Sequence, residues 1–155
     1  MAENETVSRL LSRLRNQCSR REYCIADVRA RALKALDGDG EAAEAVVELL
    51  KKDGYVDDGR YCAAYAREKS SISGWGEVKI RHMLSCRGLS PEDIAAGLAE
   101  TDAGQASARL HKLLAVKKKS LDGDPQCRLK LLRFAIGRGY RCDEVMEALK
   151  EMERE

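Results

Sequence analysis

Three glycines in this chain follow helix-like runs in the same way, and this pattern limits the possible folds more than any other feature. Gly54, Gly88 and Gly139 each have apolar residues four and eight positions earlier, and each is followed at once by Tyr or Leu. Glycine adopts the left-handed conformation that ends a helix, and the next apolar side chain packs back on the last turn. The pattern therefore predicts three helices that end in the same kind of cap.

A further helix follows two of these caps at a fixed distance. The matching apolar positions after the second and third glycines are Ile94 and Leu98, and Val145 and Leu149. The first copy has Arg60 and Ala64 there, so we expect it to diverge. Repeats of this size cannot bury an apolar face alone and must stack. We predict an all-α fold of about nine helices, arranged as tandem three-helix repeats over residues 1–55, 56–101 and 102–155.

Other residues mark where helices begin and where units join. Ser19 and Glu22 have the spacing of a capping box, and Ser90 stands before a proline at the start of a run. Asp58 is a further N-cap candidate. The lysine run and turn residues of 117–124 indicate a hinge that joins the last unit.

Charge alternates in sign along the chain, although the formal net charge is only +2. The basic stretches are residues 6–34, 60–87 and 109–141, and the acidic stretches are 37–58, 90–104 and 143–155. The modest net charge therefore hides basic stretches that are suited to a polyanion or to an acidic groove of a protein.

Six cysteines lie inside helical patterns, behind a polar and acidic start at Met1. No apolar run follows that start, so we expect no signal peptide. No stretch approaches the roughly 20 apolar residues that a membrane span needs. We therefore expect a cytoplasmic protein, with no membrane contact, whose cysteines are reduced apolar side chains rather than disulfides.

Chemistry-bearing motifs are missing from the sequence: it has no Walker loop, no GxSxG and no HExxH. His82 with Cys86 one turn later could ligate a metal, but a packed thiol on a half-exposed helix is the favoured interpretation. The carboxylates of Asp57 and Asp58 are explained by an N-cap and its dipole partner. Trp75, between two glycines, is expected to pack between two units. We expect no enzyme, no cofactor and no metal site.

Four ordered segments resemble motifs of the RecX family of RecA regulators. Residues 54–61 (GYVDDGRY) resemble its G-Y-[LIV]-[DN]-D-x-R-[FY] motif, and residues 18–23 (CSRREY) resemble its R-S-R-x-E-L entry. Residues 76–89 resemble its G-x-x-x-I-x-x-x-L-x-x-K-G-I segment, and residues 130–140 resemble its R-F-L-x-R-[RK]-G-[FY] element. Gly137 departs from the basic residue that is usual in the last motif.

The resemblance implies an elongated, curved array of three three-helix repeats that binds in the groove of the RecA–single-stranded-DNA filament. It implies damping of ATP hydrolysis, strand exchange and co-protease activity, with a weak contact to single- or double-stranded DNA. We expect a monomer. The contact candidates come from the basic stretches: Arg60, Lys79, Arg81, Arg87, Arg133 and Arg138. Two alternatives stay open: a nucleic-acid-binding protein that acts without RecA, and a helical-repeat scaffold with an unrelated protein partner.

Overall fold

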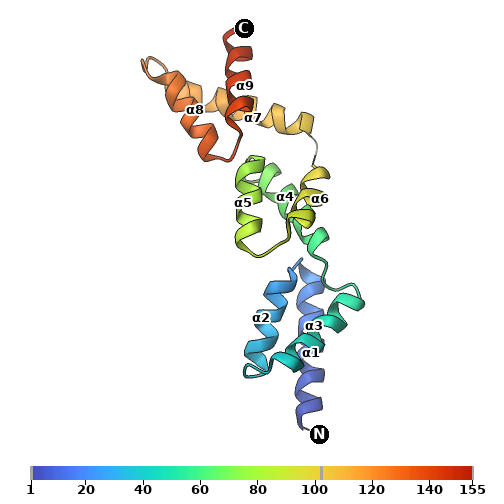
Figure 1. The fold of residues 1–155 in the computed structure, drawn as a ribbon. Helices are drawn as coiled ribbons and strands as arrows, with labels where there is room; N and C mark the ends of the chain where they lie inside the picture. Colours follow the sequence, from blue (N-terminus) through green and yellow to red (C-terminus); the bar gives the residue numbers. More distant parts are fainter. Residues whose placement is uncertain (1, 102, 155) are drawn as a thin grey trace.

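The computed structural model describes residues 2–101 and 103–154, and this part of the chain contains helices and turns but no strand (Figure 1). The predicted all-α fold is confirmed. The molecule is elongated, and its two termini lie at opposite ends. The helices of the described part are α1 (Ala2–Arg20), α2 (Ile25–Ala35), α3 (Gly40–Lys52), α4 (Asp58–Ser71), α5 (Glu77–Cys86), α6 (Pro91–Ala99), α7 (Ala103–Ser120), α8 (Cys127–Gly137) and α9 (Cys142–Arg154).

Each group of three consecutive helices packs around an apolar core of its own. We call α1–α3, α4–α6 and α7–α9 the first, second and third units. Burial of one large aliphatic side chain stabilises a fold by about 1.5–3 kcal/mol, and every unit buries several. Fully buried side chains of the three cores include Leu14 and Val46, Ile80 and Leu84, and Leu114 and Val145.

The three glycine caps have the geometry of Schellman motifs. The φ angles of Gly54, Gly88 and Gly139 are +77°, +85° and +99°. In each motif the residue after the glycine donates its N–H to the carbonyl five positions earlier, as Tyr55 does to Leu50 at 2.9 Å. A side chain in this backbone conformation is strained, which explains why glycine stands at all three positions.

These caps do not close equivalent helices, and this corrects the alignment of the first copy. Gly54 ends α3, the third helix of its unit, whereas Gly88 and Gly139 end the second helices α5 and α8. The equivalent turn of the first unit follows α2, where Asp37 has a φ of +53° and Gly38 donates its N–H to a carbonyl of the last turn. The pattern after Gly54 diverges because it belongs to a different step of the repeat.

The capping box predicted at Ser19 and Glu22 is wrong. The hydroxyl of Ser19 donates to the carbonyl of Arg15 within the last turn of α1, and Glu22 forms an ion pair with Arg60. Packing outweighs the local cap because the buried stripe of α1 continues through this position. That stripe consists of Leu10, Leu14 and Cys18.

Two other sequence signals have clear outcomes. The N-cap at Ser90 is confirmed, because its hydroxyl oxygen accepts the N–H of Asp93 at 3.1 Å. The hinge at residues 117–124 is misplaced: α7 continues through the lysines to Ser120, and the turn after it joins α7 to α8 inside the third unit. Lysine is a good helix former, and cations near a helix C-terminus interact favourably with the dipole.

Candidate partner-binding surface

The second and third units meet where the N-terminus of α5 abuts the C-terminus of α8. Gly76 donates its N–H to the carbonyl of Arg138 at 2.8 Å, and Val78 donates to Gly139 at 2.9 Å. The first amides of a helix and its last carbonyls have no partner within the helix, so the two helix ends satisfy each other. A Cβ on Gly76 would lie 2.5 Å from the backbone of Gly139, so this contact depends on the absence of a side chain.

Two side chains of the third unit reinforce this joint. Arg138 donates from its guanidinium to the carbonyl of Ser73, and the hydroxyl of Tyr140 donates to the carbonyl of Gly74, both at 3.2 Å. Burial raises the pKa of the Tyr140 hydroxyl above its ordinary value, which keeps it protonated as the donor. The candidate Arg138 therefore has a structural task at the joint.

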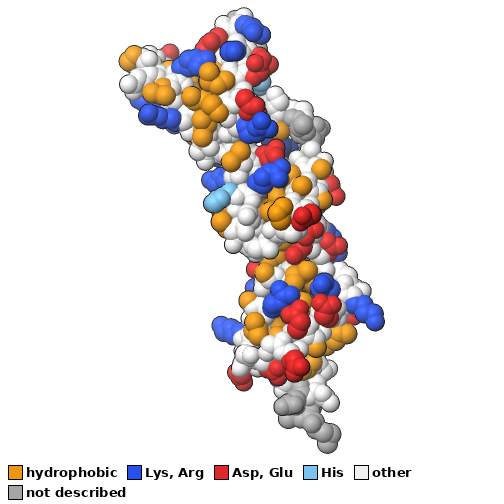
Figure 2. All heavy atoms as spheres, in the orientation of Figure 1, with side chains coloured by type: hydrophobic (Ala, Val, Ile, Leu, Met, Phe, Trp, Pro, Cys, Tyr) orange, Lys and Arg blue, Asp and Glu red, His pale blue; other side chains and the backbone are white. Residues whose placement is uncertain are grey.

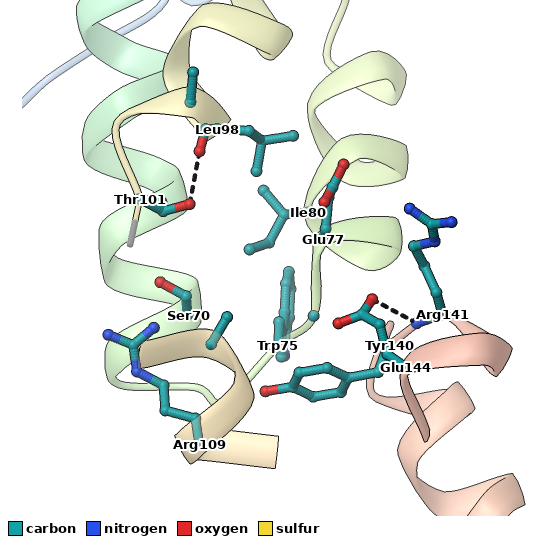
Figure 3. A pocket seen from close by; sticks show the side chains of 13 residues that line it. Ser70, Trp75, Glu77, Ile80, Leu98, Thr101, Arg109, Tyr140, Arg141 and Glu144 are labelled. Carbon is teal, nitrogen blue, oxygen red and sulfur yellow. Dashed lines mark hydrogen bonds between the residues drawn. The ribbon is translucent and has the colours of Figure 1, made fainter. Parts of the chain in front are cut away.

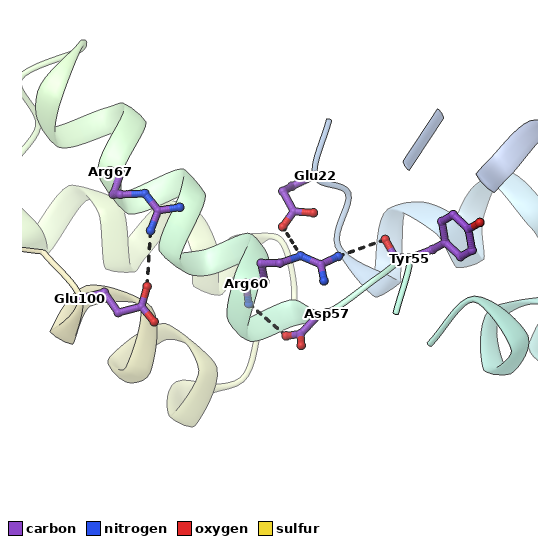
Figure 4. A network of polar contacts seen from close by, with 6 residues as sticks. All are labelled: Glu22, Tyr55, Asp57, Arg60, Arg67 and Glu100. Carbon is purple, nitrogen blue, oxygen red and sulfur yellow. Dashed lines mark hydrogen bonds and ion pairs between the residues drawn. The ribbon is translucent and has the colours of Figure 1, made fainter. Parts of the chain in front are cut away.

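The first joint is made by side chains rather than by backbone groups. Arg60 forms an ion pair with Glu22 at 2.5 Å and donates to the carbonyl of Tyr55 at 3.2 Å (Figure 4). Asp57 caps α4 by accepting the N–H of Arg60 at 3.0 Å. The candidate Arg60 thus ties the segment between α1 and α2 to the start of the second unit.

Asp58 is not the N-cap of its own helix but serves a helix of the neighbouring unit. Its Oδ1 accepts the N–H of Ile25 at 2.8 Å and so satisfies an open amide at the start of α2. Burial raises the pKa of this carboxyl above its ordinary value, and the nearby Asp93 and Asp57 raise it further. Asp57 and Asp58 therefore both have structural roles. Keeping the Asp58 carboxyl ionised in its partly buried position, near two other carboxylates, costs electrostatic free energy.

A line of cations fixed over aromatic rings runs along the second unit. Tyr61 and Tyr65 of α4 stack at 6.0 Å, and Tyr65 meets Trp75 edge-on at 6.4 Å. The ammonium of Lys69 lies 5.5 Å from the Tyr65 ring and 4.9 Å from Trp75, and that of Lys79 lies 4.4 Å from Trp75. Each such contact contributes about 0.5–1 kcal/mol at an exposed site.

Arg87 completes this line at its other end. Its guanidinium donates to the hydroxyl of Tyr61 at 2.8 Å and lies 5.4 Å from the centre of the Tyr65 ring. Burial raises the pKa of both tyrosines, so the Tyr61 hydroxyl stays protonated and accepts this bond through its oxygen. We call the set the cation–ring row; its members are Arg87, Tyr61, Tyr65, Lys69, Trp75 and Lys79.

The row has neighbours in both flanking units. Arg21 and Glu22 of the first unit line, together with Tyr61, Lys69 and Arg87, a cleft of about 350 Å³. In the third unit, Lys117 and Arg138 lie 5.0 and 5.2 Å from the ring of Phe134. Cations held over rings therefore occur in every unit, because Arg21 also lies 4.5 Å from the ring of Tyr23.

A second cleft, of about 370 Å³, lies at the joint between the second and third units. In Figure 3, Trp75 and Tyr140 line it from opposite units, and Arg109 approaches from α7. Trp75 therefore lies between two units, as expected from its glycine neighbours, while its ring also packs on the core of α4–α6. This cleft borders the row at Trp75.

The remaining candidates lie outside the cation–ring row. Arg81 is exposed and forms an ion pair with Glu77 one turn earlier, at 2.6 Å. Arg133 is exposed on α8, and no ion pair or hydrogen bond of its side chain is found in the described part of the chain. The structure thus joins Lys79 and Arg87 in the row, and it leaves Arg81 and Arg133 apart from it.

The alternating charge stretches of the sequence neutralise one another in the fold. Charges of both signs are mixed on the face drawn in Figure 2. Several ion pairs join a basic stretch to an acidic one, among them Arg15–Asp53, Arg29–Glu44, Arg67–Glu100 and Arg128–Glu153. On that face the basic stretches of the sequence do not form one continuous basic patch.

Sequence analysis missed Tyr65, Lys69 and Phe134 as parts of this surface. Tyr61, Tyr65 and Lys69 are spaced by four residues and therefore share one face of α4. That spacing was visible in the sequence. The partner of Phe134 was not, because Lys117 and Phe134 lie on different helices.

Within residues 2–101 and 103–154, every helix is too short or too polar to cross a membrane. In the same residues, no group of three or more His, Cys, Asp or Glu side chains is placed to hold a metal ion.

Residues 57–98, which cover most of α4–α6, match the family model described as RecX, second three-helix domain. A protein of Clostridium acetobutylicum named Regulatory protein RecX is 32% identical over 116 residues, or 70% of this chain. The protein of the same name from Pseudomonas entomophila is 29% identical over 131 residues, and the match covers 82% of this chain and 81% of the relative. The chain belongs to the RecX family.

The fold of this RecX-family chain also matches solved structures. The crystal structure of RecX from Lactobacillus salivarius has a TM-score of 0.86 at 17% identity, and the match covers 98% of this chain and 99% of that one. A second structure, titled Crystal structure of regulatory protein RecX, has a TM-score of 0.83 and 22% identity over 97% of this chain. The chain spans about half the length of the Clostridium relative, with 53% covered.

Proposed function

We propose that this protein modulates RecA, and that it acts as an inhibitor, by binding in the groove of the RecA–single-stranded-DNA filament. Binding there would damp ATP hydrolysis, strand exchange and co-protease activity. The protein acts in the cytoplasm as a monomer and carries out no catalysis. The observation that carries the proposal is the cation–ring row, together with the membership of a family of regulatory proteins.

The row has the properties of a binding surface rather than of a catalytic site. Tryptophan and arginine are among the residues that dominate the binding energy of protein interfaces, and the row presents Trp75 and Arg87. The rings of Tyr61 and Tyr65 are buried in the core, so they hold the cations in place and do not themselves offer contact area. A cation already held over a ring loses less conformational freedom on binding than a free one. Lys69, Lys79 and Arg87 are fixed in this way. Because cations over rings occur in all three units, an elongated molecule can contact more than one protomer of a filament.

The test measures the DNA-dependent ATPase of RecA while this protein is added at sub-stoichiometric ratios. Replacement of both lysines of the row, Lys69→Glu with Lys79→Glu, is expected to raise the half-inhibiting concentration at least about tenfold, or 1.4 kcal/mol. The matched control is Arg9→Glu with Lys150→Glu, which makes the same charge change at exposed positions on α1 and α9. The control should inhibit as the parent does.

The two outcomes that would overturn the proposal are distinct. If the parent protein neither inhibits the ATPase nor sediments with the filament, RecA is not the partner and a scaffold with another partner is favoured. If both double variants weaken inhibition equally, overall charge matters and the row is not the contact. The single variant Arg133→Glu tests whether the exposed face of α8 also contributes to inhibition of RecA.

Direct contact with nucleic acid is a second candidate function, favoured by one observation on the third unit. Lys112, Lys118 and Lys119 of α7 line the same open depression of about 790 Å³. Binding of the protein alone to DNA through these lysines would weaken steeply with salt, by orders of magnitude over a few-fold rise. A DNA-binding constant that does not change with salt concentration would exclude this second function.

A further inference from the structure

Helix α5 carries an exposed histidine and an exposed cysteine that face each other one turn apart. His82 Nε2 lies 3.6 Å from Cys86 Sγ, and both side chains are exposed to solvent. Residues four apart are neighbours on a helix surface, so the backbone of α5 holds the two groups in register. Neither group belongs to the cation–ring row or to a core.

We propose that His82 and Cys86 form a bidentate half-site for a thiophilic divalent cation, of which Zn²⁺ is the physiological example. Zinc binds imidazole nitrogen at about 2.0–2.1 Å and thiolate sulfur at about 2.3 Å with tetrahedral angles. Those values require a separation of about 3.6 Å between the nitrogen and the sulfur. The thiol and the imidazole already have this separation because they are hydrogen-bonded to each other, so the ion can take the place of the shared proton with little rearrangement of either side chain.

The charges around the pair do not prevent binding. Arg81, next to His82, forms an ion pair with Glu77, and Arg87, next to Cys86, donates to Tyr61. Both cations therefore have partners of their own. Binding replaces the thiol proton by the metal, so a sulfur–metal bond forms and one proton is released without any redox change. Two positions of the tetrahedron would remain for water.

Imidazole and thiolate also define the class of the ion. Soft thiolate with imidazole favours zinc and cadmium, whereas magnesium and calcium prefer oxygen ligands. Two protein ligands give weaker binding than the four of a structural zinc site, and folding does not depend on the metal because α5 is already formed. The half-site thus makes the Cys86 thiol responsive to zinc.

The experiment alkylates the full-length reduced protein with iodoacetamide, with and without Zn²⁺, and follows each cysteine by peptide mass spectrometry. Zinc is expected to slow alkylation of Cys86 strongly. Cys142 is the internal control, because it is exposed and should react at the same rate in both conditions. In the His82→Ala variant the protection should weaken at least about tenfold, since loss of even an outer-sphere partner costs about 10–100-fold in affinity.

Direct ligation by the ring has a separate readout. The protein contains two histidines, and Zn²⁺ should shift the NMR ring resonances of His82 but not those of His111. Mg²⁺ at the same concentration should shift neither. Equal protection of Cys86 and Cys142, or full protection of Cys86 in His82→Ala, would overturn the half-site. Because the His82 side chain is exposed, the His82→Ala variant is expected to fold as the parent does, and circular dichroism will check this.

Discussion

Replacing Gly76 by alanine should separate the second unit from the third without unfolding either. Gly76 has a φ of −83°, which alanine adopts without strain, so the effect comes from the new Cβ alone. That carbon would lie 2.5 Å from the carbonyl carbon and oxygen of Gly139 and 2.6 Å from the nitrogen of Tyr140. All three are backbone atoms, which cannot turn aside as a flexible side chain can.

The magnitude follows from the contacts that must then open. Non-bonded carbon atoms rest at about 3.5–4.0 Å, so α5 and α8 must move apart by about 1 Å. The bonds from Gly76 and Val78 to the end of α8, now 2.8 and 2.9 Å long, would then exceed hydrogen-bond distance. Two such bonds contribute about 1–3 kcal/mol together. Alanine also restricts the unfolded chain more than glycine does, and this effect stabilises the folded state by only about 0.4–1 kcal/mol.

The assay is amide hydrogen exchange under native conditions, read at Val78, together with urea unfolding. We expect Val78 to lose protection and unfolding to become less cooperative, because the third unit no longer depends on the second. Gly137→Ala is the matched control: it lies at the end of α8, and its Cβ would meet nothing within 4 Å. That variant should gain about 0.5–1 kcal/mol from helix propensity. If the two variants behave alike, the close approach at Gly76 is not what couples the units.

Two further predictions concern groups whose pKa is raised by burial. Asp58→Ala should destabilise the protein by about 1–3 kcal/mol because the amide of Ile25 loses its acceptor, whereas Asp58→Asn keeps an acceptor oxygen and should lose less. Since the folded pKa of Asp58 is raised, the folded state binds the proton more tightly, and its contribution to stability falls as pH rises above the unfolded pKa. Urea melts of the parent and Asp58→Asn should therefore diverge in favour of the variant as pH rises from about 4; a constant difference would refute the assignment. Burial raises the pKa of two thiols to about 11, so they should react with a disulfide reagent at pH 8 only through unfolding, while exposed thiols react at once; equal rates would contradict the buried placement. The slow pair is Cys24 and Cys62, and the fast pair is Cys86 and Cys142.

Local features of the fold could be predicted from the sequence because their causes lie within a few residues. A Schellman cap needs a glycine and apolar neighbours at fixed positions, and all of these are visible around Gly88 and Gly139. The capping box at Ser19 failed for the opposite reason. Whether α1 ends there depends on a buried stripe that packs against α3, and on an amide of Ile25 that is satisfied by a residue 33 positions away.

The candidate surface could be predicted from the sequence only where its residues recur at a fixed spacing within one helix. Tyr61, Tyr65 and Lys69 could have been grouped by their spacing on α4. The roles of Arg60 and Arg138 could not, because each depends on a carbonyl or carboxylate of another unit. The sequence alone does not distinguish a basic residue that holds two units together from one whose side chain faces solvent.

The two joints solve the same physical problem with different groups. In both, the second helix of one unit begins at the boundary with the next, and its first amides need acceptors. The side chain of Asp58 supplies the acceptor for α2, and the carbonyls at the end of α8 supply those for α5. The motifs that carry Asp58 and Gly139 therefore encode how units are joined. These residues serve the joints whatever the array binds. Lys79 itself lies against Gly139 at the second joint, so a residue outside the joints, such as Lys69, is where the choice of partner has to be sought.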